Sequence, residues 1–159
     1  IWAIGKMPDI QRVFAYHGAE HKTINAFEAH SELTPEKVSK FPLEHPRCGT
    51  GFLLTVVIIS ILVFSPLRPL PFLIRLPSQL VLVPLIACLA YEYVRWTANH
   101  LNQPLVRILV APNLALQKLT TREPSLDMLE VSIASFNAMY ALENDKKEEK
   151  GIPDQASIQ

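Results

Sequence analysis

The chain has 159 residues, with 15 lysines and arginines against 15 aspartates and glutamates, so its formal net charge is zero. This balance argues against a nucleic-acid-binding module, which usually carries a basic excess. Hydrophobic residues make up 49% of the chain and charged residues only 19%, whereas a typical soluble domain is about 25% charged. The composition therefore excludes a mainly disordered chain and favours a membrane protein over a soluble enzyme.

The first segment, residues 1–47, predicts helices at or near a membrane surface. Ile10, Val13 and Phe14 share one face of a helix, and such an apolar face suits an interfacial position. Thr34 and Pro35 are residue types preferred at the N-cap and the first position of a helix, so a second, short helix is expected there.

Residues 48–96 predict two membrane spans. No acidic or basic side chain occurs in the 20 residues between Arg47 and Arg68, and about 20 apolar residues are what a helix needs to cross a bilayer. A second uncharged run covers 76–91 and leads into an aromatic cluster that ends at Trp96, which is typical of a membrane interface.

The loop between the two spans contains only two of the 15 basic residues, Arg68 and Arg75. Both ends of such a hairpin lie on the same side of the membrane, so the other basic residues share that side. Cytoplasmic flanks are generally enriched in lysine and arginine. Most of the polar part of the chain is therefore expected to be cytoplasmic.

The segment 97–143 predicts amphipathic and cytoplasmic helices. A first helix, over 104–119, is expected to lie on the membrane and to break at Pro112. A capping-box pattern from Asp127 to Glu130 predicts the start of a second helix that runs to about Glu143. Residues 144–159 have mixed charge and are expected to form a mobile tail.

The predicted fold class is thus an all-α membrane protein, a transmembrane helical hairpin with flanking cytoplasmic and interfacial helices. Its expected partners are the lipid bilayer and other membrane-protein subunits, and no nucleic acid. The four segments are 1–47, 48–96, 97–143 and 144–159.

The pattern His17-Gly-Ala-Glu20-His21 is the inverted form of a zinc-protease motif. Two histidines four residues apart project from one face of a helix and can bind one zinc or other divalent ion. Glu20 beside them is the candidate catalytic base. The alternative is a polar network in which His17, Glu20 and His21 bond to the backbone and to lipid headgroups.

A catalytic zinc needs a third protein ligand. His45 and Cys48 precede the first span and Glu92 lies near the end of the second, so a hairpin brings all three to one membrane surface. Each also has a simpler interpretation. His45 and Cys48 would cap the first span, and Glu92 would pair with Arg95 or Arg47.

Two functions from different classes follow from these residues. The first is a metal-dependent hydrolase at the cytoplasmic face that acts on a peptide, lipid or amide. The second is a non-catalytic structural or assembly subunit of a larger membrane complex, favoured by the lack of a nucleophile triad, a phosphate loop or a redox motif.

Three longer motifs resemble the YqhQ-like family of bacterial integral membrane proteins. They are YHGAEHKTINAFEA at 16–29, HPRCGTGFLL at 45–54 and LQKLTTREP at 116–124. The resemblance implies a protein of the bacterial inner membrane or of a plastid membrane, and a metal-dependent enzyme. The family positions that it carries over are His17, Glu20, His21, His45 and Cys48, with Lys22, Arg47, Glu92, Arg122 and Glu123 as further polar positions.

One departure from that family concerns the N-terminus. Its members usually have an additional glycine-rich and membrane-spanning portion before the Tyr16-His17 region, which this sequence lacks, and the sequence begins at Ile1 instead of methionine. The expectation is a shortened member or the later part of a longer chain. A site that needs the earlier portion would be incomplete in it.

Overall fold

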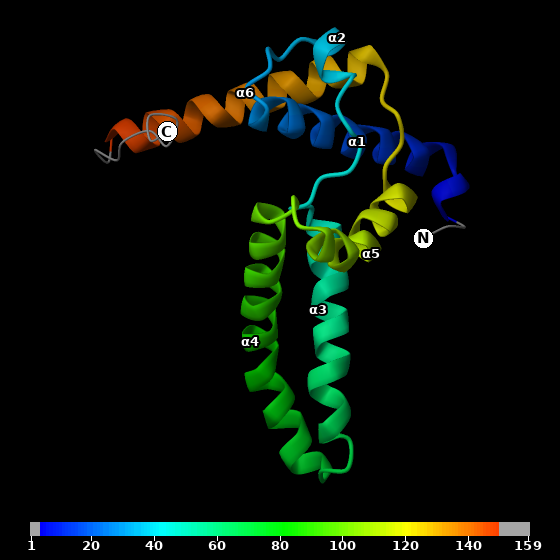
Figure 1. Cartoon of the computed structure of the whole chain (residues 1–159), viewed down its shortest axis with the longest axis vertical. Helices are drawn as coiled ribbons and strands as arrows, with labels where there is room; N and C mark the ends of the chain where they lie inside the picture. The colour runs from blue at the N-terminus through cyan, green and yellow to red at the C-terminus, as the bar shows by residue number, and fades with distance from the viewer. Residues whose placement is uncertain (1–3, 150–159) are drawn as a thin grey trace. The chain divides into compact units, whose positions relative to one another are not determined.

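The structure is a computed structural model that describes residues 4–149, and all regular elements in that range are helices (Figure 1). This confirms the all-helical fold class for the described part of the chain. The elements are η1 Ile4–Lys6, α1 Pro8–Glu28, α2 Pro35–Val38, α3 Gly49–Phe64, η2 Ser65–Leu67, α4 Phe72–Asn99, α5 Pro104–Thr120 and α6 Leu126–Glu149.

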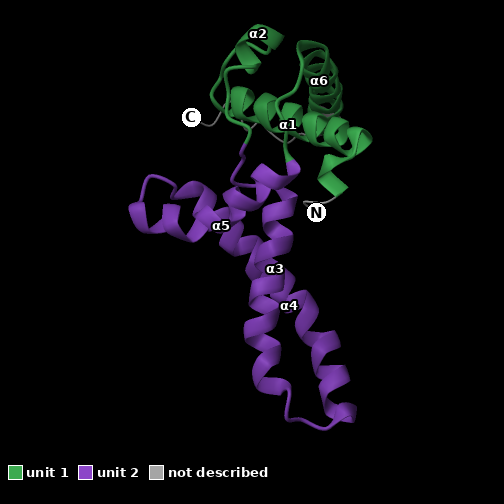
Figure 2. Ribbon diagram, turned by 90° about the vertical axis from the view of Figure 1, so that its right-hand side faces the viewer, with its two compact units in different colours: residues 1–43, 121–159 green, residues 44–120 purple. Residues whose placement is uncertain are grey.

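The chain divides into two compact units (Figure 2). Unit 1 combines Ile1–Leu43 with Thr121–Gln159, and unit 2 is Glu44–Thr120. Unit 1 is therefore built from the two ends of the sequence, and unit 2 is the continuous stretch between them.

Unit 1 is a small helical domain in which α1 packs against α6 and α2 covers them. Its buried core consists of apolar side chains from the three helices: Ala19, Ala26, Val38, Leu129 and Ile133. The alanines allow α1 to approach its neighbours closely. The short helix α2 begins at Pro35 with Thr34 at the N-cap, as the sequence predicts.

The last helix is longer than its apolar pattern indicates. α6 continues to Glu149, whereas the expected end was near Glu143. Residues 145–149 are Asp-Lys-Lys-Glu-Glu, and four of these five are strong helix formers that tolerate full exposure to solvent. The rest of the predicted mobile tail, residues 150–159, lies outside the described residues.

Gly18 allows the segment around Arg122 to pass close to α1. An ideal Cβ at this position would overlap the carbonyl oxygen of Arg122 and would lie 2.8 Å from Cδ2 of Leu43. The backbone N–H of Arg122 also donates to the carbonyl of Phe14, at 3.0 Å. Glycine has a low intrinsic helix propensity, and the close packing of Arg122 and Leu43 explains why it occupies position 18 of this helix.

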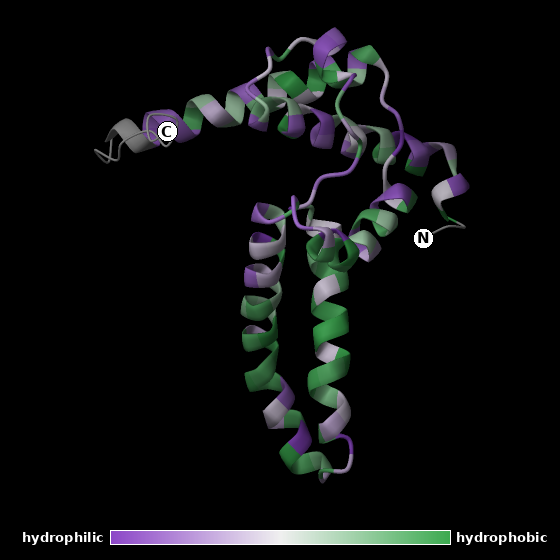
Figure 3. Ribbon diagram, in the orientation of Figure 1, coloured by the Kyte–Doolittle hydropathy of each residue, from purple (hydrophilic) through white to green (hydrophobic). Residues whose placement is uncertain are grey.

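Unit 2 is dominated by α3 and α4, which lie side by side and antiparallel, joined by a short connection (Figures 1 and 2). Gly49–Leu67 and Phe72–Asn99 are both long and apolar enough to cross a membrane. Only 11% and 6% of their most apolar windows are buried inside the protein. Figure 3 shows hydrophobic residues along the middle of both helices and hydrophilic ones towards their ends.

α5 packs on the first half of α3 through small and polar residues. Thr55 donates to the carbonyl of Gly51 at 2.9 Å and accepts from Nδ2 of Asn113 at 3.1 Å. The helices approach closely at Gly51, where a Cβ would be in van der Waals contact with Cβ of Asn113, at 3.4 Å. Small residues at helix crossings are typical of membrane bundles.

The expected break in this helix at Pro112 is wrong, because α5 runs without interruption from Pro104 to Thr120. A proline removes one backbone donor, yet the helix continues through it. Buried residues on both sides of Pro112, Val110 and Asn113, hold the two halves of α5 in the fold.

Candidate metal centre

His17 and His21 lie together on α1, as their spacing predicts. Their ring centroids are 4.3 Å apart, with the rings edge to face at 66°. His21 is buried, with 3% of its surface exposed, and His17 is partly buried. Two imidazoles are therefore side by side in a setting largely shielded from bulk water.

The ring of His21 is oriented by the backbone of the same unit. Its Nδ1 lies 2.6 Å from the carbonyl oxygen of Leu43. A carbonyl only accepts, so Nδ1 carries the proton and, in the neutral ring, Nε2 is the nitrogen with the lone pair. Histidines that bind metals almost always donate their other ring N–H to a carbonyl or carboxylate in this way.

The same face of α1 makes three further hydrogen bonds to the 39–43 segment. The ammonium of Lys22 donates to the carbonyls of Ser39 and Phe41 at 2.7 and 2.8 Å, and Asn25 donates to the carbonyl of Pro42 at 3.0 Å. The motif around His21 thus also has a structural role, since it satisfies the carbonyls of a loop without regular structure. Sequence reasoning missed this role of Lys22 and Asn25.

Lys22 has a third partner in the carboxylate of Glu123, whose Oε1 lies 2.8 Å from the lysine nitrogen. The lysine side chain is only 5% exposed, while that of Glu123 is 64% exposed. A buried ammonium is costly unless it is paired and hydrogen-bonded. Here two carbonyls and one carboxylate surround it, and they tie three segments of unit 1 together.

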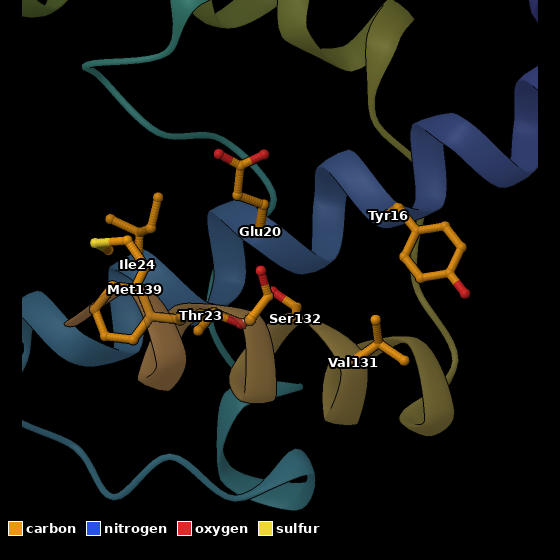
Figure 4. A pocket seen from close by; sticks show the side chains of 9 residues that line it. Tyr16, Glu20, Thr23, Ile24, Val131, Ser132 and Met139 are labelled. Carbon is orange, nitrogen blue, oxygen red and sulfur yellow. The ribbon is translucent and has the colours of Figure 1, made fainter. Parts of the chain in front are cut away.

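Glu20, the predicted base, lies on the wall of a groove between α1 and α6 (Figure 4). The groove has a volume of about 370 Å³ and is lined from α6 by residues such as Ser132 and Phe136. One of its walls is fixed by a hydrogen bond of 2.9 Å between the hydroxyls of Thr23 and Ser132. Glu20 itself is exposed, so its carboxylate is accessible to a molecule in the groove.

Cys48 is the N-cap residue of α3 in unit 2 and is 7% exposed. Its Sγ lies 3.0 Å from Oγ1 of Thr50. The positive end of a helix stabilises a negative charge such as that of a thiolate ligand. Cys48 is therefore a candidate thiolate donor within unit 2, as His17 and His21 are candidate imidazole donors within unit 1.

His45 is buried and is held within unit 2 by contacts with Arg47 and Gln117. Its Nδ1 accepts the backbone N–H of Arg47 at 3.3 Å, so the neutral ring carries its proton on Nε2. The amide of Gln117 bonds to the His45 backbone twice, with Oε1 accepting from N–H at 2.8 Å and Nε2 donating to the carbonyl at 2.9 Å.

Gln117 is a further residue whose role sequence reasoning missed. It is fully buried, and a glutamine amide is the side chain that can satisfy one backbone N–H and one C=O of the same residue. Its only signal in the sequence is its place in the 116–124 motif.

Glu92 lies in unit 2 on an exposed side of α4. Its carboxylate pairs with Arg95, with Oε1 3.9 Å from Nη1 and both side chains about two-thirds exposed. An exposed pair at this distance contributes little to stability. The arrangement matches the simpler interpretation of Glu92, and the group of donors identified among the described residues does not include it.

Comparison with known proteins places the chain in a family. A family model described as a protein of unknown function (DUF1385) matches residues 1–142. The uncharacterized protein YqhQ of Bacillus subtilis (strain 168) is 36% identical over 143 residues, which are 90% of this chain and 45% of that protein. The chain thus spans less than half the length of that relative, and no solved structure gives a significant match. The matches identify the chain as a member of the YqhQ-like, DUF1385 family.

Proposed function

We propose that this chain is an integral membrane protein with a divalent metal site in which His17 and His21 are ligands. The observation that carries the proposal is the bond from the His21 Nδ1–H to the carbonyl of Leu43. It fixes the tautomer and the orientation that a metal-binding imidazole needs, next to a second imidazole 4.3 Å away.

The third ligand in this proposal is Cys48. Leu43 is bonded to His21, and Cys48 follows Leu43 by only five positions. A connection of this length reaches at most about 17 Å when extended, so the chain allows the thiol to reach the two imidazoles. Two imidazoles and one thiolate form a donor set that zinc prefers, with a fourth position left for water or substrate.

Hydrolysis is the reaction that these residues suit. A bound zinc supplies a Lewis acid that lowers the pKa of a coordinated water. Glu20 would be the general base, and the groove beside it would hold the substrate. The groove combines apolar side chains such as Phe136 and Met139 with the hydroxyls of Ser132 and Ser135, which suits an amphipathic substrate with an amide or ester bond.

The membrane part of the proposal rests on α3 and α4. Their apolar side chains are largely exposed, for example Leu62 at 67% and Leu80 at 77%, and a bilayer is the solvent that such surfaces require. We propose that both helices cross the membrane, with the 68–71 connection outside and the polar residues of both units on the cytoplasmic side.

Cobalt titration of the purified protein tests the metal site. Thiolate-bound cobalt has a charge-transfer absorption in the near ultraviolet, so the wild-type protein is expected to show this band. Cys48→Ser should abolish it, and His17→Gln should weaken cobalt binding by roughly 10-fold or more. Cys88→Ser is the matched control, because Cys88 is an exposed thiol in α4, and it should leave the band unchanged. A band that survives in Cys48→Ser would refute the proposed ligand.

Cysteine labelling tests the proposed orientation. In a chain that lacks its own cysteines, Leu70→Cys should react with a membrane-impermeant maleimide added to intact cells. Glu36→Cys should react only after the cells are permeabilised. The opposite result would reverse the proposed topology.

The alternative function, a subunit or assembly factor, is favoured by exposed apolar side chains of α6, two of which also line the groove beside Glu20. Val131, Met139 and Leu142 are each about half exposed or more, and apolar residues on the surface of a small polar unit suit a protein partner. Crosslinking from a photoreactive residue at Leu142 in living cells would detect such a partner.

A further inference from the structure

A hollow in unit 2 lies where the start of α3 meets the end of α4. It has a volume of about 500 Å³, which is within the range of small-molecule binding sites. Arg47, Gly49 and Phe52 line it from the α3 side, and Tyr91, Arg95 and Asn99 line it from the α4 side. Neither the metal site nor the groove at Glu20 includes any of these residues.

The polar side of this hollow has the chemistry of a phosphate site. Two guanidinium groups, from different segments, line the same hollow, and the planar fork of arginine matches the geometry of a phosphate. The pairing of Arg95 with Glu92, at 3.9 Å and in solvent, is too weak to hold the guanidinium elsewhere. Asn99 adds an amide that can donate to a phosphate oxygen.

The first turn of α3 adds to this positive potential. A Cβ built on Gly49 would meet no atom within 4 Å, so the start of the helix is open. The N–H groups of the first helical turn favour an anion. This contribution is secondary to that of the two arginines, because Asn99 is the last residue of α4 and the carbonyls at that helix end act in the opposite direction.

The surroundings of the hollow are those of a lipid headgroup. Phe52 and Tyr91 give it apolar walls, and Tyr91 and Trp96 at the same end of α4 are 59% and 46% exposed. Aromatic residues at that level are typical of a membrane interface. Along both helices, exposed leucines and valines continue from the hollow towards the connection between them.

We infer that this hollow binds the phosphate of an anionic phospholipid, whose acyl chains lie along α3 and α4. The inference rests on the proposed insertion of these two helices in the membrane. The ligand would be a phosphate group with a net negative charge, attached to acyl chains that the apolar surfaces of the two helices can cover. Basic hollows at the ends of membrane helices bind lipid headgroups in this way.

The opposite end of the two helices provides a matched control. A second hollow, of about 540 Å³, is lined by Arg68 and Arg75, so it also contains two arginines. It is lined by Phe64 and Ser65 at the end of α3, and it has neither the Tyr91 wall nor the Asn99 amide of the first hollow. Equal charge is therefore present without these further contacts for a headgroup.

The experiment measures which lipids remain bound to the purified protein. The chain is reconstituted in vesicles of equal parts phosphatidylglycerol and phosphatidylcholine, extracted in mild detergent and analysed by native mass spectrometry. The wild-type protein should retain phosphatidylglycerol in preference to phosphatidylcholine. The double variant Arg47→Gln/Arg95→Gln should lose that preference by roughly tenfold, since two charge-assisted hydrogen-bonding groups are removed. Arg68→Gln/Arg75→Gln should keep it.

Three results would overturn the inference. The first is an unchanged preference in Arg47→Gln/Arg95→Gln, and the second is an equal loss in Arg68→Gln/Arg75→Gln. The third is displacement of the retained lipid by inorganic phosphate, which would assign the hollow to a soluble anion. Circular dichroism of both double variants checks that their helix content is that of the wild type.

A separate measurement distinguishes failure of this inference from failure of the proposed membrane insertion. Extraction of membranes with alkaline carbonate removes peripheral proteins and leaves integral ones. If the chain resists extraction but shows no lipid preference, the lipid site is wrong and the insertion stands. If the chain is extracted, both are wrong.

Discussion

Arg122 passes over Gly18 so closely that its carbonyl oxygen occupies the place where a side chain at position 18 would begin. The two residues are more than a hundred positions apart in the sequence, and both belong to unit 1. Their contact joins the first helix to the segment that leads into α6. It also makes Gly18 a position where even one methyl group is excluded.

Gly18→Ala is therefore expected to destabilise the protein by about 3 kcal/mol, although alanine is the better helix former. The overlap is with a backbone atom, so a simple side-chain rotation cannot relieve it. Thermal unfolding followed by circular dichroism in detergent measures the effect. Gly49→Ala is the control, because the space around Gly49 is open, and it should unfold at or slightly above the wild-type temperature. Equal stability of Gly18→Ala and wild type would contradict the close approach.

Removal of the buried ammonium in Lys22→Met should cost about 2 kcal/mol, because the carbonyls of Ser39 and Phe41 lose their donor. The exposed position of Glu123 limits the additional loss from the ion pair. Chemical denaturation gives the free energy of unfolding for comparison with the wild type.

Lys37→Met is the matched variant for that measurement. Lys37 also pairs with a glutamate, Glu32, at 2.5 Å, but both side chains are more than half exposed. Its loss should change the free energy of unfolding by less than about 1 kcal/mol. If both lysine variants lost the same stability, burial of Lys22 would not be the cause.

Gln117→Leu should destabilise unit 2 by about 2 kcal/mol, since the backbone N–H and C=O of His45 would both lose their partner in a buried place. Hydrogen exchange should show faster exchange of the His45 amide in the variant. Gln103→Leu, at an exposed site before α5, is the control. In this variant the His45 amide should exchange at the wild-type rate. If the His45 amide exchanged at the wild-type rate in Gln117→Leu, the hydrogen bond to Gln117 would not be what protects it from exchange.

The pH dependence of stability should include a contribution from Asp127 at the start of α6. The hydrogen bond from Ser125 lowers the pKa of this carboxyl below its usual 3.8, and N–H groups of the first helical turn act in the same direction. A group with a depressed pKa in the folded state stabilises the fold above its unfolded pKa and loses this contribution as the pH falls through the folded value.

Asp127→Asn should accordingly lower the unfolding temperature at pH 7, and its difference from the wild type should shrink below pH 3.8. Unfolding curves between pH 7 and about pH 2 would show this. A difference that is constant over the range would mean that the charge of Asp127 does not contribute.

The sequence predicts best what depends on local patterns. The uncharged stretch after Arg47 became a helix close to where it was expected, and α6 begins at Leu126, so Asp127 lies in its first turn and not at the predicted cap position. The helix at Pro35 was also correct, because proline and threonine act through the geometry of a single turn. The predicted helix break at Pro112 was wrong, since tertiary packing overrides the low helix propensity of one residue.

The site is only partly predictable, for a physical reason. The spacing of His17 and His21 places them on one face of a helix, which is a local property. The carbonyl that orients His21 comes from residue 43, in a segment with no periodicity to reveal its course. The same is true of Gln117, whose partner His45 lies 72 positions earlier in the chain.

The burial of Lys22 also affects its reactivity. Its nitrogen is enclosed by the carbonyls of Ser39 and Phe41 and by the carboxylate of Glu123, so an acylating reagent reaches it only when this part of unit 1 opens. Lys37 is exposed and reacts without such an opening. The ratio of the two acylation rates therefore reports, in the native protein, how often the 39–41 segment leaves the first helix.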